Sequence, residues 1–263
     1  MQIHSDIFSP HFVKHLMFNR FRTMLSKFLI PRASCVRVVS ERIKKSVIRT
    51  CNVRTDIACP SIVVLPILGK SVDLNVEPKR FPEFDKTILM VSRLTSEKNI
   101  GLAIEAMAEV IRKHPKIGLV IVGDGPEREA LKLQTTNYKL QTNVKFVGWQ
   151  TDVASYYKGA DIFLLTSLYE GWGMGVVDAM RYGTAIVMTD VGVAGELVEN
   201  NKNGLVVPVG DKNALVAAVL RLLENDNLCR NLAESAAGKV KKLPNEEGYY
   251  ERMVESWQKC SNS

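Results

Sequence analysis

The sequence lacks long hydrophobic runs and paired cysteine motifs. None of its 263 residues belongs to a stretch approaching the roughly 18 consecutive apolar residues of a transmembrane helix. The opening residues, MQIHSDIFSP, lack the basic-then-apolar layout of a signal peptide. No CxxC spacing occurs, which predicts reduced thiols in a cytosolic protein and argues against a metal site or a disulfide framework. The five cysteines are Cys35, Cys51, Cys59, Cys229 and Cys260.

The composition is that of a folded, globular chain. Hydrophobic residues make up 46% and charged residues 24% of the sequence, which excludes disorder or a collagen-like repeat as the main state. The length suffices for one large domain or two modest ones, with a sizeable core.

The net charge of +7 is concentrated near the amino terminus. Residues 1–60 contain eleven Lys/Arg and three Asp/Glu, a formal charge of +8. This region is either a solvated basic face or a contact surface for an anionic membrane or a phosphorylated substrate. Because no zinc-finger, RNP or basic-zipper pattern accompanies the charge, we expect no nucleic-acid partner.

The patterns in the first third of the chain predict a segment of strands and helices. In HFVKHLMFNRFRTMLSKFLI, five apolar residues share one helical stripe, which favours a core-facing helix over a membrane anchor. A strand at 35–40 (CVRVVS), a short basic helix at 41–49 and an apolar run at 62–65 follow. The polar, proline-bearing stretch 69–82 is the best linker candidate. The stripe residues are Met17, Phe21, Met24, Leu25 and Phe28.

From Thr87 onward, short apolar runs alternate with helical periods. The runs ILMVS, IGLVIVG, NVKFVG, DIFLLTS and TAIVMTD are apolar on both faces, as a parallel sheet covered by helices requires. The helical periods between them fall at 100–113, 126–134, 152–158 and 173–182. This alternation predicts a doubly wound α/β domain, whose ligands bind at the carboxyl ends of the strands.

Two of the loops after these strands carry weak signals. In RLTSEKN, Arg93 and Lys98 precede a helix, which is either an anion site or a pair of solvated charges. The GxG of GDGPER resembles a dinucleotide-binding turn, but Arg128 stands where the third glycine belongs.

The strongest signal is SLYEGWGMGVVDAM, residues 167–180. Its three glycines, between an acid and a helix, allow backbone to approach a ligand closely. Because helical side chains lean toward the helix amino terminus, Asp178 is expected to face the same loop as Glu170. A phosphate at the helix start and sugar hydroxyls at the two carboxylates would fit these groups.

The run EGWGMGVVDAMRYGTAIVMTD, residues 170–190, resembles the nucleotide-binding signature of retaining GT-B glycosyltransferases of family 4, the glycosyl transferases group 1. SRLTSEKN, VGDGPER and GELVENNKNGLVVPVGD resemble the diphosphate loop, a second loop and the closing segment of that family. The similarity runs from about Thr87 to Leu223, with a weaker one over 1–66 that includes QIHSD.

The resemblance implies roles for particular residues. Arg93 and Lys98 would bind the donor diphosphate, Glu170 would act on the transferred sugar, and His4 would face that sugar across an interdomain cleft. Asp178 would bind the ribose, although the family motif usually ends in Glu; Val193 and Ala194 also replace glycine-rich positions. The further expected donor-binding residues are Gly123, Gly125, Gly171, Trp172, Gly173 and Met174.

The resemblance also implies an architecture of four parts. Residues 1–66 would be the tail of an amino-terminal Rossmann-like domain, 67–84 a linker, 85–242 the nearly complete nucleotide-sugar-binding domain, and 243–263 a helix crossing back. We therefore expect an amino-terminally truncated enzyme. Alone, it would not transfer sugar at a meaningful rate, and it would expose the apolar residues Phe12, Phe21 and Phe28.

The expected activity is transfer of a sugar, with retention, from a nucleotide sugar to a lipid-linked or polysaccharide precursor of the cell envelope. The setting is the cytoplasm or the inner face of the membrane. No metal cofactor is expected, because none of the eleven aspartates forms a DxD pair. The alternatives are a non-catalytic nucleotide-sugar-binding remnant and a nucleotide-sugar epimerase of the same fold; an NAD-dependent oxidoreductase fits least, since GxGxxG is missing.

Overall fold

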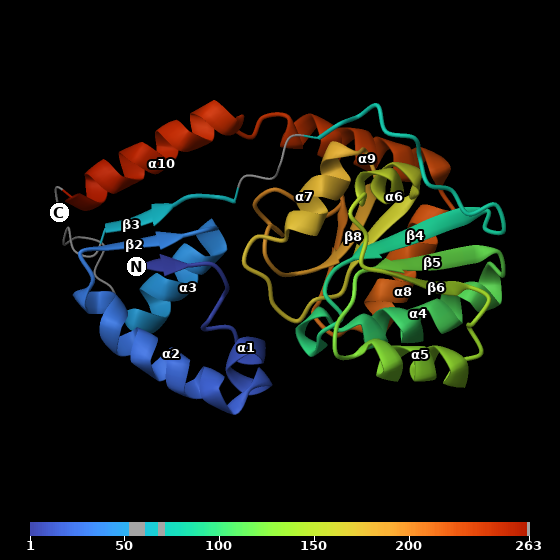
Figure 1. Cartoon of the computed structure of the whole chain (residues 1–263), viewed down its shortest axis with the longest axis horizontal. Coiled ribbons are helices and arrows are strands. Elements are labelled where there is room, and N and C mark those ends of the chain that lie inside the picture. The colour runs from blue at the N-terminus through green and yellow to red at the C-terminus, as the bar shows by residue number, and fades with distance from the viewer. Residues whose placement is uncertain (53–60, 68–71, 262–263) are drawn as a thin grey trace.

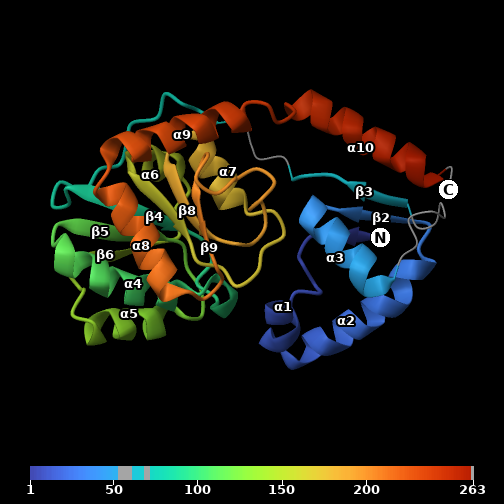
Figure 2. The ribbon, with the colours of Figure 1, turned by 180° about the vertical axis from the view of Figure 1, so that it is seen from behind.

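The computed structural model describes residues 1–52, 61–67 and 72–261, which form two parallel β-sheets with their helices (Figure 1). The predicted linker at 67–84 lies partly outside these residues. The smaller sheet has three strands near the amino terminus, and the larger one has six. Figure 2 shows the same two units from behind, with α10 (Glu246–Ser261) extending from the larger unit over the smaller one.

The larger sheet has the order β6-β5-β4-β7-β8-β9, and every pairing within it is parallel. Numbered along the chain, this is the 3-2-1-4-5-6 order of a Rossmann fold, which confirms the predicted doubly wound domain. The strands are β4 (Lys86–Val91), β5 (Ile117–Val122), β6 (Val144–Gly148), β7 (Ile162–Leu165), β8 (Ala185–Thr189) and β9 (Leu205–Val207).

Helices cover both faces of this sheet because its strands are apolar on both sides. On β4, Ile88 and Met90 join the core beneath α4, α5 and α8, whereas Leu89 joins the core beneath α6, α7 and α9. Every residue of β5 is buried, which explains its continuous apolar run. The helices are α4 (Ile100–Lys113), α5 (Arg128–Asn137), α6 (Ala154–Gly159), α7 (Met174–Arg181), α8 (Lys212–Leu223) and α9 (Asp226–Val240).

The smaller sheet has the order β1-β2-β3, with β1 at one edge and α10 packed against β3 at the other. The guanidinium of Arg37 on β2 lies 5.7 Å from the centre of the Trp257 ring of α10. The elements of this unit are β1 (Gln2–Ile3), α1 (Pro10–His15), α2 (Met17–Leu29), η1 (Ile30–Arg32), β2 (Cys35–Val38), α3 (Glu41–Cys51) and β3 (Ser61–Val64).

Contacts at the start of α3 join the two units. The carboxylate of Glu196 accepts hydrogen bonds from the backbone N–H groups of Glu41 (3.0 Å) and Arg42 (2.7 Å). The Arg42 guanidinium donates to the backbone carbonyls of Asp190 and Ala194, at 3.0 Å each, and pairs with the Asp190 carboxylate. An anion at a helix amino terminus is favourable, so this contact also stabilises α3.

The predicted helix at residues 17–29 is present, but its apolar stripe is not core. Met17 is 82% exposed and Phe21 is 57% exposed, whereas the polar Asn19 and Thr23 are buried. Asn19 donates to the Phe12 carbonyl at 2.9 Å, and Thr23 donates to the Ile7 carbonyl at 3.0 Å. The polar face of the helix therefore finds its hydrogen-bond partners in the interior of the smaller unit. The interpretation of this stripe as core was therefore wrong.

The expected exposure of three phenylalanines is confirmed for two of them. Phe21 and Phe28 are each 57% exposed, but Phe12 is 7% exposed because its ring packs edge-on against Tyr169 at 5.3 Å.

The expectation that all cysteines are reduced needs a correction. Cys35 takes part in a disulfide bond, whereas Cys51 and Cys229 are free. Burial raises the pKa of Cys51 to about 11, which keeps that thiol protonated and unreactive. Cys59 lies outside the described residues.

None of the helices within the described residues combines the length and the hydropathy needed to cross a membrane.

Candidate functional site

The candidate site lies where the strand order of the larger sheet reverses. The central strand β4 pairs with β5 on one side and with β7 on the other, so the loops after β4 and β7 lie side by side. Two hydrogen bonds join these loops: Thr166 Oγ1 donates to the Lys98 carbonyl at 2.9 Å, and the Leu168 N–H donates to the Glu97 carbonyl at 2.8 Å. In doubly wound sheets this reversal is where ligands bind.

A cavity of about 330 Å³ opens at this point. The loop after β4, the loop after β7 and residues 4–5 from the smaller unit line it, so its wall combines both units. The structure thus brings most of the predicted site residues together, including His4. The predicted residues that line it are His4, Arg93, Lys98, Glu170, Gly171, Trp172, Gly173 and Met174.

Lys98 and Glu170 form an ion pair in this cavity. The Lys98 Nζ lies 2.6 Å from the Glu170 Oε1, and the two side chains are only 16% and 14% exposed. Ser167 Oγ donates to the same carboxylate oxygen at 2.9 Å, which orients Glu170. A shielded ammonium and carboxylate side by side can bind an anionic group and a hydroxyl-bearing group of one ligand.

Arg93 provides a second cation at the mouth of the cavity. Its side chain is 77% exposed, and one Nη lies 3.4 Å from the Glu97 carboxylate. Because the contact is long and the guanidinium is largely in solvent, the ion pair is weak and Arg93 is available to an incoming anion.

The helix α7 begins at the floor of the cavity. Gly173 precedes it with a φ of +92°, a left-handed conformation that favours glycine. No side chain among the described residues caps this helix start. Its first N–H groups therefore suit an anion, as the glycine spacing predicted.

Gly171 meets the smaller unit at the edge of the same cavity. A Cβ placed on Gly171 would lie 1.6 Å from the backbone carbonyl oxygen of His4. Only a residue without a side chain allows this approach, which brings His4 to the cavity wall.

Gly123 and Gly125 do not line the cavity but support the loop that carries Arg93. A Cβ on Gly123 would lie 1.9 Å from the Ser92 carbonyl oxygen, and one on Gly125 would lie 2.4 Å from that of Leu94. These two glycines let the loops after β4 and β5 pack backbone to backbone.

Asp178 also lies outside the cavity lining, although its position in the early turns of the helix predicted that its side chain faces the loop of Glu170. It lies on α7, where its carboxylate is 3.5 Å from the guanidinium of Arg181. Burial raises the pKa of Asp178, an effect that Arg181 partly opposes.

The sequence motifs missed two polar side chains at the cavity, those of Ser92 and Tyr169. Ser92 Oγ is buried and has no hydrogen-bond partner within the described part of the chain, and the same holds for Nε1 of the predicted Trp172. Tyr169, next to Glu170, contacts α1: its hydroxyl lies 3.2 Å from His15 Nδ1. The position of Ser92 directly before Arg93 is the only sequence signal that could have identified it.

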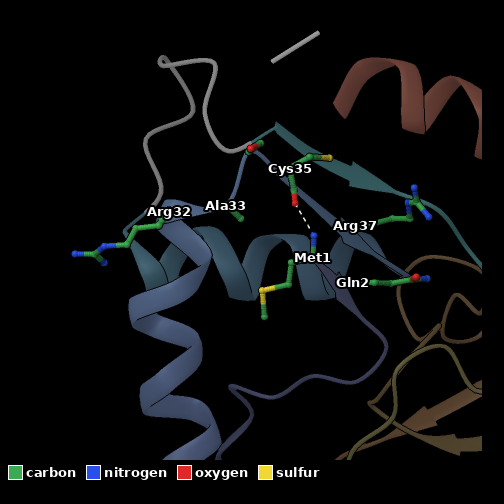
Figure 3. A pocket seen from close by; sticks show the side chains of 7 residues that line it. Met1, Gln2, Arg32, Ala33, Cys35 and Arg37 are labelled. Atoms are coloured by element: carbon green, nitrogen blue, oxygen red, sulfur yellow. Dashed lines mark hydrogen bonds between the residues drawn. The ribbon is translucent and has the colours of Figure 1, made fainter. Parts of the chain in front are cut away.

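A larger cavity of about 590 Å³ lies elsewhere, beside the amino terminus and the edge strand β1 (Figure 3). The Met1 ammonium donates to the Cys35 carbonyl at 2.9 Å, and Arg32 and Arg37 lie nearby. None of the predicted site residues lines this cavity, and it contains no acidic side chain.

The chain belongs to the family of glycosyl transferases group 1, which matches residues 72–239. Among curated relatives, it is 33% identical over 176 residues to an amylovoran biosynthesis glycosyltransferase of Erwinia amylovora, covering 64% of this chain and 43% of the relative. It is 37% identical over 105 residues to an alpha-monoglucosyldiacylglycerol synthase of Streptococcus pneumoniae, covering 39% and 24%. The chain thus spans less than half the length of either relative.

Solved structures show the GT-B fold. The sucrose-phosphate synthase of Thermosynechococcus elongatus matches with a TM-score of 0.81 and 26% identity, covering 98% of this chain and 66% of that one. Anabaena HepE in complex with UDP and glucose matches with a TM-score of 0.80 and 22% identity, covering 98% and 70%. Because the matches span nearly the whole chain, the smaller unit fits this fold too.

Replacing Gly171 by alanine tests the contact with His4. We expect Gly171→Ala to destabilise the protein by about 1–3 kcal/mol, because the new methyl group must displace backbone. The control is Gly238→Ala in α9, where nothing lies within 4 Å and where alanine should stabilise by about 0.5–1 kcal/mol. Denaturant unfolding measures both; a neutral Gly171→Ala would contradict the close approach.

The raised pKa of Asp178 predicts that the stability of the protein depends on pH. Because its pKa is higher in the folded than in the unfolded protein, the free energy of unfolding should fall as pH rises from the ordinary value of 3.8 through the native pKa. Asp178→Asn should remove this component and be more stable relative to wild type at pH 7 than at pH 4. Denaturant titrations across that range test it, with the exposed Asp85→Asn as the control; equal pH profiles for wild type and Asp178→Asn would refute it.

Proposed function

We propose that this chain is the donor-binding part of a retaining glycosyltransferase of family 4 that uses a nucleotide-sugar donor. The observation that carries the proposal is the cavity at the strand-order reversal, where Arg93, Lys98, Glu170 and the start of α7 converge. The group 1 family match supports it. UDP in the HepE complex gives the first ligand to test.

In this proposal the bond between the sugar C1 and the diphosphate oxygen breaks, and a bond from C1 to an acceptor hydroxyl oxygen forms on the same face. The leaving diphosphate gains negative charge, and its departing oxygen takes up the hydroxyl proton that the acceptor gives up. Arg93, Lys98 and the N–H groups at the start of α7 stabilise that charge electrostatically. Glu170 holds the sugar, and His4 faces it from the smaller unit.

Lys98 has a second role before the donor arrives. Its ion pair with Glu170 keeps both charges compensated in a largely shielded site. The diphosphate of the donor competes with Glu170 for the Lys98 ammonium, which frees the carboxylate to bind sugar hydroxyls. One donor molecule thus gives each of the two charged groups a new partner.

The proposed acceptor is a lipid-linked or polysaccharide precursor of the cell envelope. The proposed location is the cytoplasm, with peripheral contact to an anionic membrane through basic residues in 1–60. An amylovoran biosynthesis enzyme and a glucosyldiacylglycerol synthase among the relatives support this class of acceptor. The comparisons favour neither an epimerase nor a non-catalytic remnant.

Binding of a nucleoside diphosphate tests the site directly. A charge-assisted contact contributes roughly 1.5–3 kcal/mol, so Arg93→Ala and Lys98→Ala should each weaken UDP binding about tenfold or more. Calorimetry with UDP, GDP and ADP measures this and identifies the preferred base. The matched control is Lys132→Ala, an exposed cation on α5. Unchanged affinity in both cavity variants would rule out the assignment of the diphosphate.

Metal independence is a separate expectation of the same site. With two cations and a helix start facing the diphosphate, UDP should bind equally well with excess EDTA or with added Mg²⁺ or Mn²⁺. Calorimetry under the three conditions decides this. A gain of about tenfold in affinity on adding Mn²⁺ would show that an ion completes the site.

A further inference from the structure

Two buried polar groups of the candidate site have no hydrogen-bond partner within the described residues. They are the Ser92 hydroxyl and the indole N–H of Trp172, and both residues line the cavity of about 330 Å³ between the loops after β4 and β7, here called the donor cavity. Across the described part of the chain, the third and last buried side-chain atom without a partner is Arg37 Nε, at the cavity beside β1. Unpaired buried groups therefore gather at the donor cavity.

Three neighbouring buried hydroxyl groups do have partners. Thr166 donates to a carbonyl of the loop after β4 at 2.9 Å. Ser167 donates to a carboxylate in the cavity at 2.9 Å, and Thr189 donates to a carbonyl of the loop after β7 at 2.8 Å. The Ser92 hydroxyl differs from these three. Because an unpaired buried donor costs free energy, a ligand that supplies the missing acceptor gains affinity from it.

Ser92 and Trp172 lie on either side of the start of α7. Ser92 directly follows β4, and a Cβ on Gly175, in the first turn of α7, would lie 3.4 Å from the carbonyl oxygen of the preceding Val91. Trp172 directly precedes Gly173, at which α7 starts without a side-chain cap among the described residues. The Trp172 side chain is 5% exposed, so its N–H is shielded from bulk water. Both unpaired groups therefore lie beside N–H groups that suit an anion.

The groups of this wall that suit an anion all donate hydrogen bonds. An indole N–H can only donate, and the same holds for the Lys98 ammonium, the Arg93 guanidinium and the first N–H groups of α7. Phosphate oxygens only accept, so a diphosphate matches all of these groups, whereas a sugar hydroxyl also needs an acceptor for its own proton. Glu170 supplies such an acceptor. The diphosphate is thus the part of the donor that complements Ser92 and Trp172.

We propose that the Ser92 hydroxyl and the Trp172 indole N–H are diphosphate ligands, each donating a hydrogen bond to a non-bridging phosphate oxygen. This inference rests on the proposed function and adds two neutral side chains to the two cations and the start of α7. As the bond from the sugar C1 to the diphosphate breaks, negative charge grows on that diphosphate, and hydrogen bonds to it strengthen. Both side chains therefore stabilise the leaving group as well as the bound donor.

Calorimetry with UDP tests the two side chains. Ser92→Ala, the near-isosteric Ser92→Cys and Trp172→Phe each remove or weaken a donor, so each should weaken UDP binding about tenfold, the usual effect of losing a hydrogen bond to a charged group. Uridine, which lacks phosphate, should bind these variants as it binds wild type in NMR titrations. The matched controls are Thr135→Val, whose hydroxyl donates to the Leu131 carbonyl on α5, and Trp257→Phe on α10. Both should bind UDP like wild type.

The indole proton of Trp172 reports on its own hydrogen bond. The sequence contains three tryptophans, and the Trp172 indole resonance is the one missing from the NMR spectrum of Trp172→Phe. UDP should move this proton resonance downfield in the wild-type chain, because a new hydrogen bond deshields the proton. Uridine should leave it in place.

Stability without ligand distinguishes a ligand-binding role from a structural one. Because Ser92→Ala lacks an unpaired buried hydroxyl, it should be at least as stable toward denaturant as wild type, although it binds UDP more weakly. A less stable Ser92→Ala, or equal losses of affinity for UDP and for uridine, would overturn the inference in favour of a structural role.

The remaining outcomes separate this inference from the proposed function. If Lys98→Ala loses UDP affinity while Ser92→Ala and Ser92→Cys keep it, the assignment of Ser92 is wrong. If the Trp172 indole resonance does not respond to UDP, the assignment of Trp172 is wrong. In both cases the proposed function stands. A wild-type chain that binds no UDP would overturn the proposed function itself.

Discussion

The pairing of β4 with both β5 and β7 is the constraint on which the rest of the site depends. Ile88 on β4 faces Leu119 of β5 on one side and Ile162 of β7 on the other. Because all three strands run parallel, their carboxyl ends meet at one edge, and the loops with Lys98 and Glu170 must emerge together. The apolar character of these strands therefore decides where two charged side chains, distant in sequence, form a shielded ion pair.

A second constraint joins the two units at this edge. Because Gly171 has no side chain, the backbone carbonyl of His4 can pack closely against the loop after β7. The carboxylate of Glu196 accepts hydrogen bonds from the first N–H groups of α3. The first contact brings a residue of the smaller unit into the cavity wall, and the second fixes α3 beside the loop after β8. The first contact requires a residue without a side chain, and the second requires a carboxylate at the start of α3, so few positions specify how the two units meet.

The doubly wound sheet and the core of the site were predictable from the sequence for a physical reason. Continuous apolar runs and helical periods are local patterns, and glycines beside Glu170 have few uses other than close backbone approach. The role of Asp178 stays a prediction: its spacing from Glu170 matches the motif, and in the structure its carboxylate lies 3.5 Å from the guanidinium of Arg181 on the same helix. The disulfide of Cys35 could not be predicted, because spacing along the chain says nothing about which thiols meet in space.

The apolar stripe of α2 shows why periodicity cannot by itself assign a buried face. A helix with apolar residues on one side has the same sequence pattern whether that side meets a core or a bilayer. What distinguishes the two is where the polar side finds partners. In α2, Asn19 and Thr23 donate to the carbonyls of Phe12 and Ile7 inside the smaller unit, so the polar side turns inward. The apolar side of α2 therefore faces outward, where its residues are exposed.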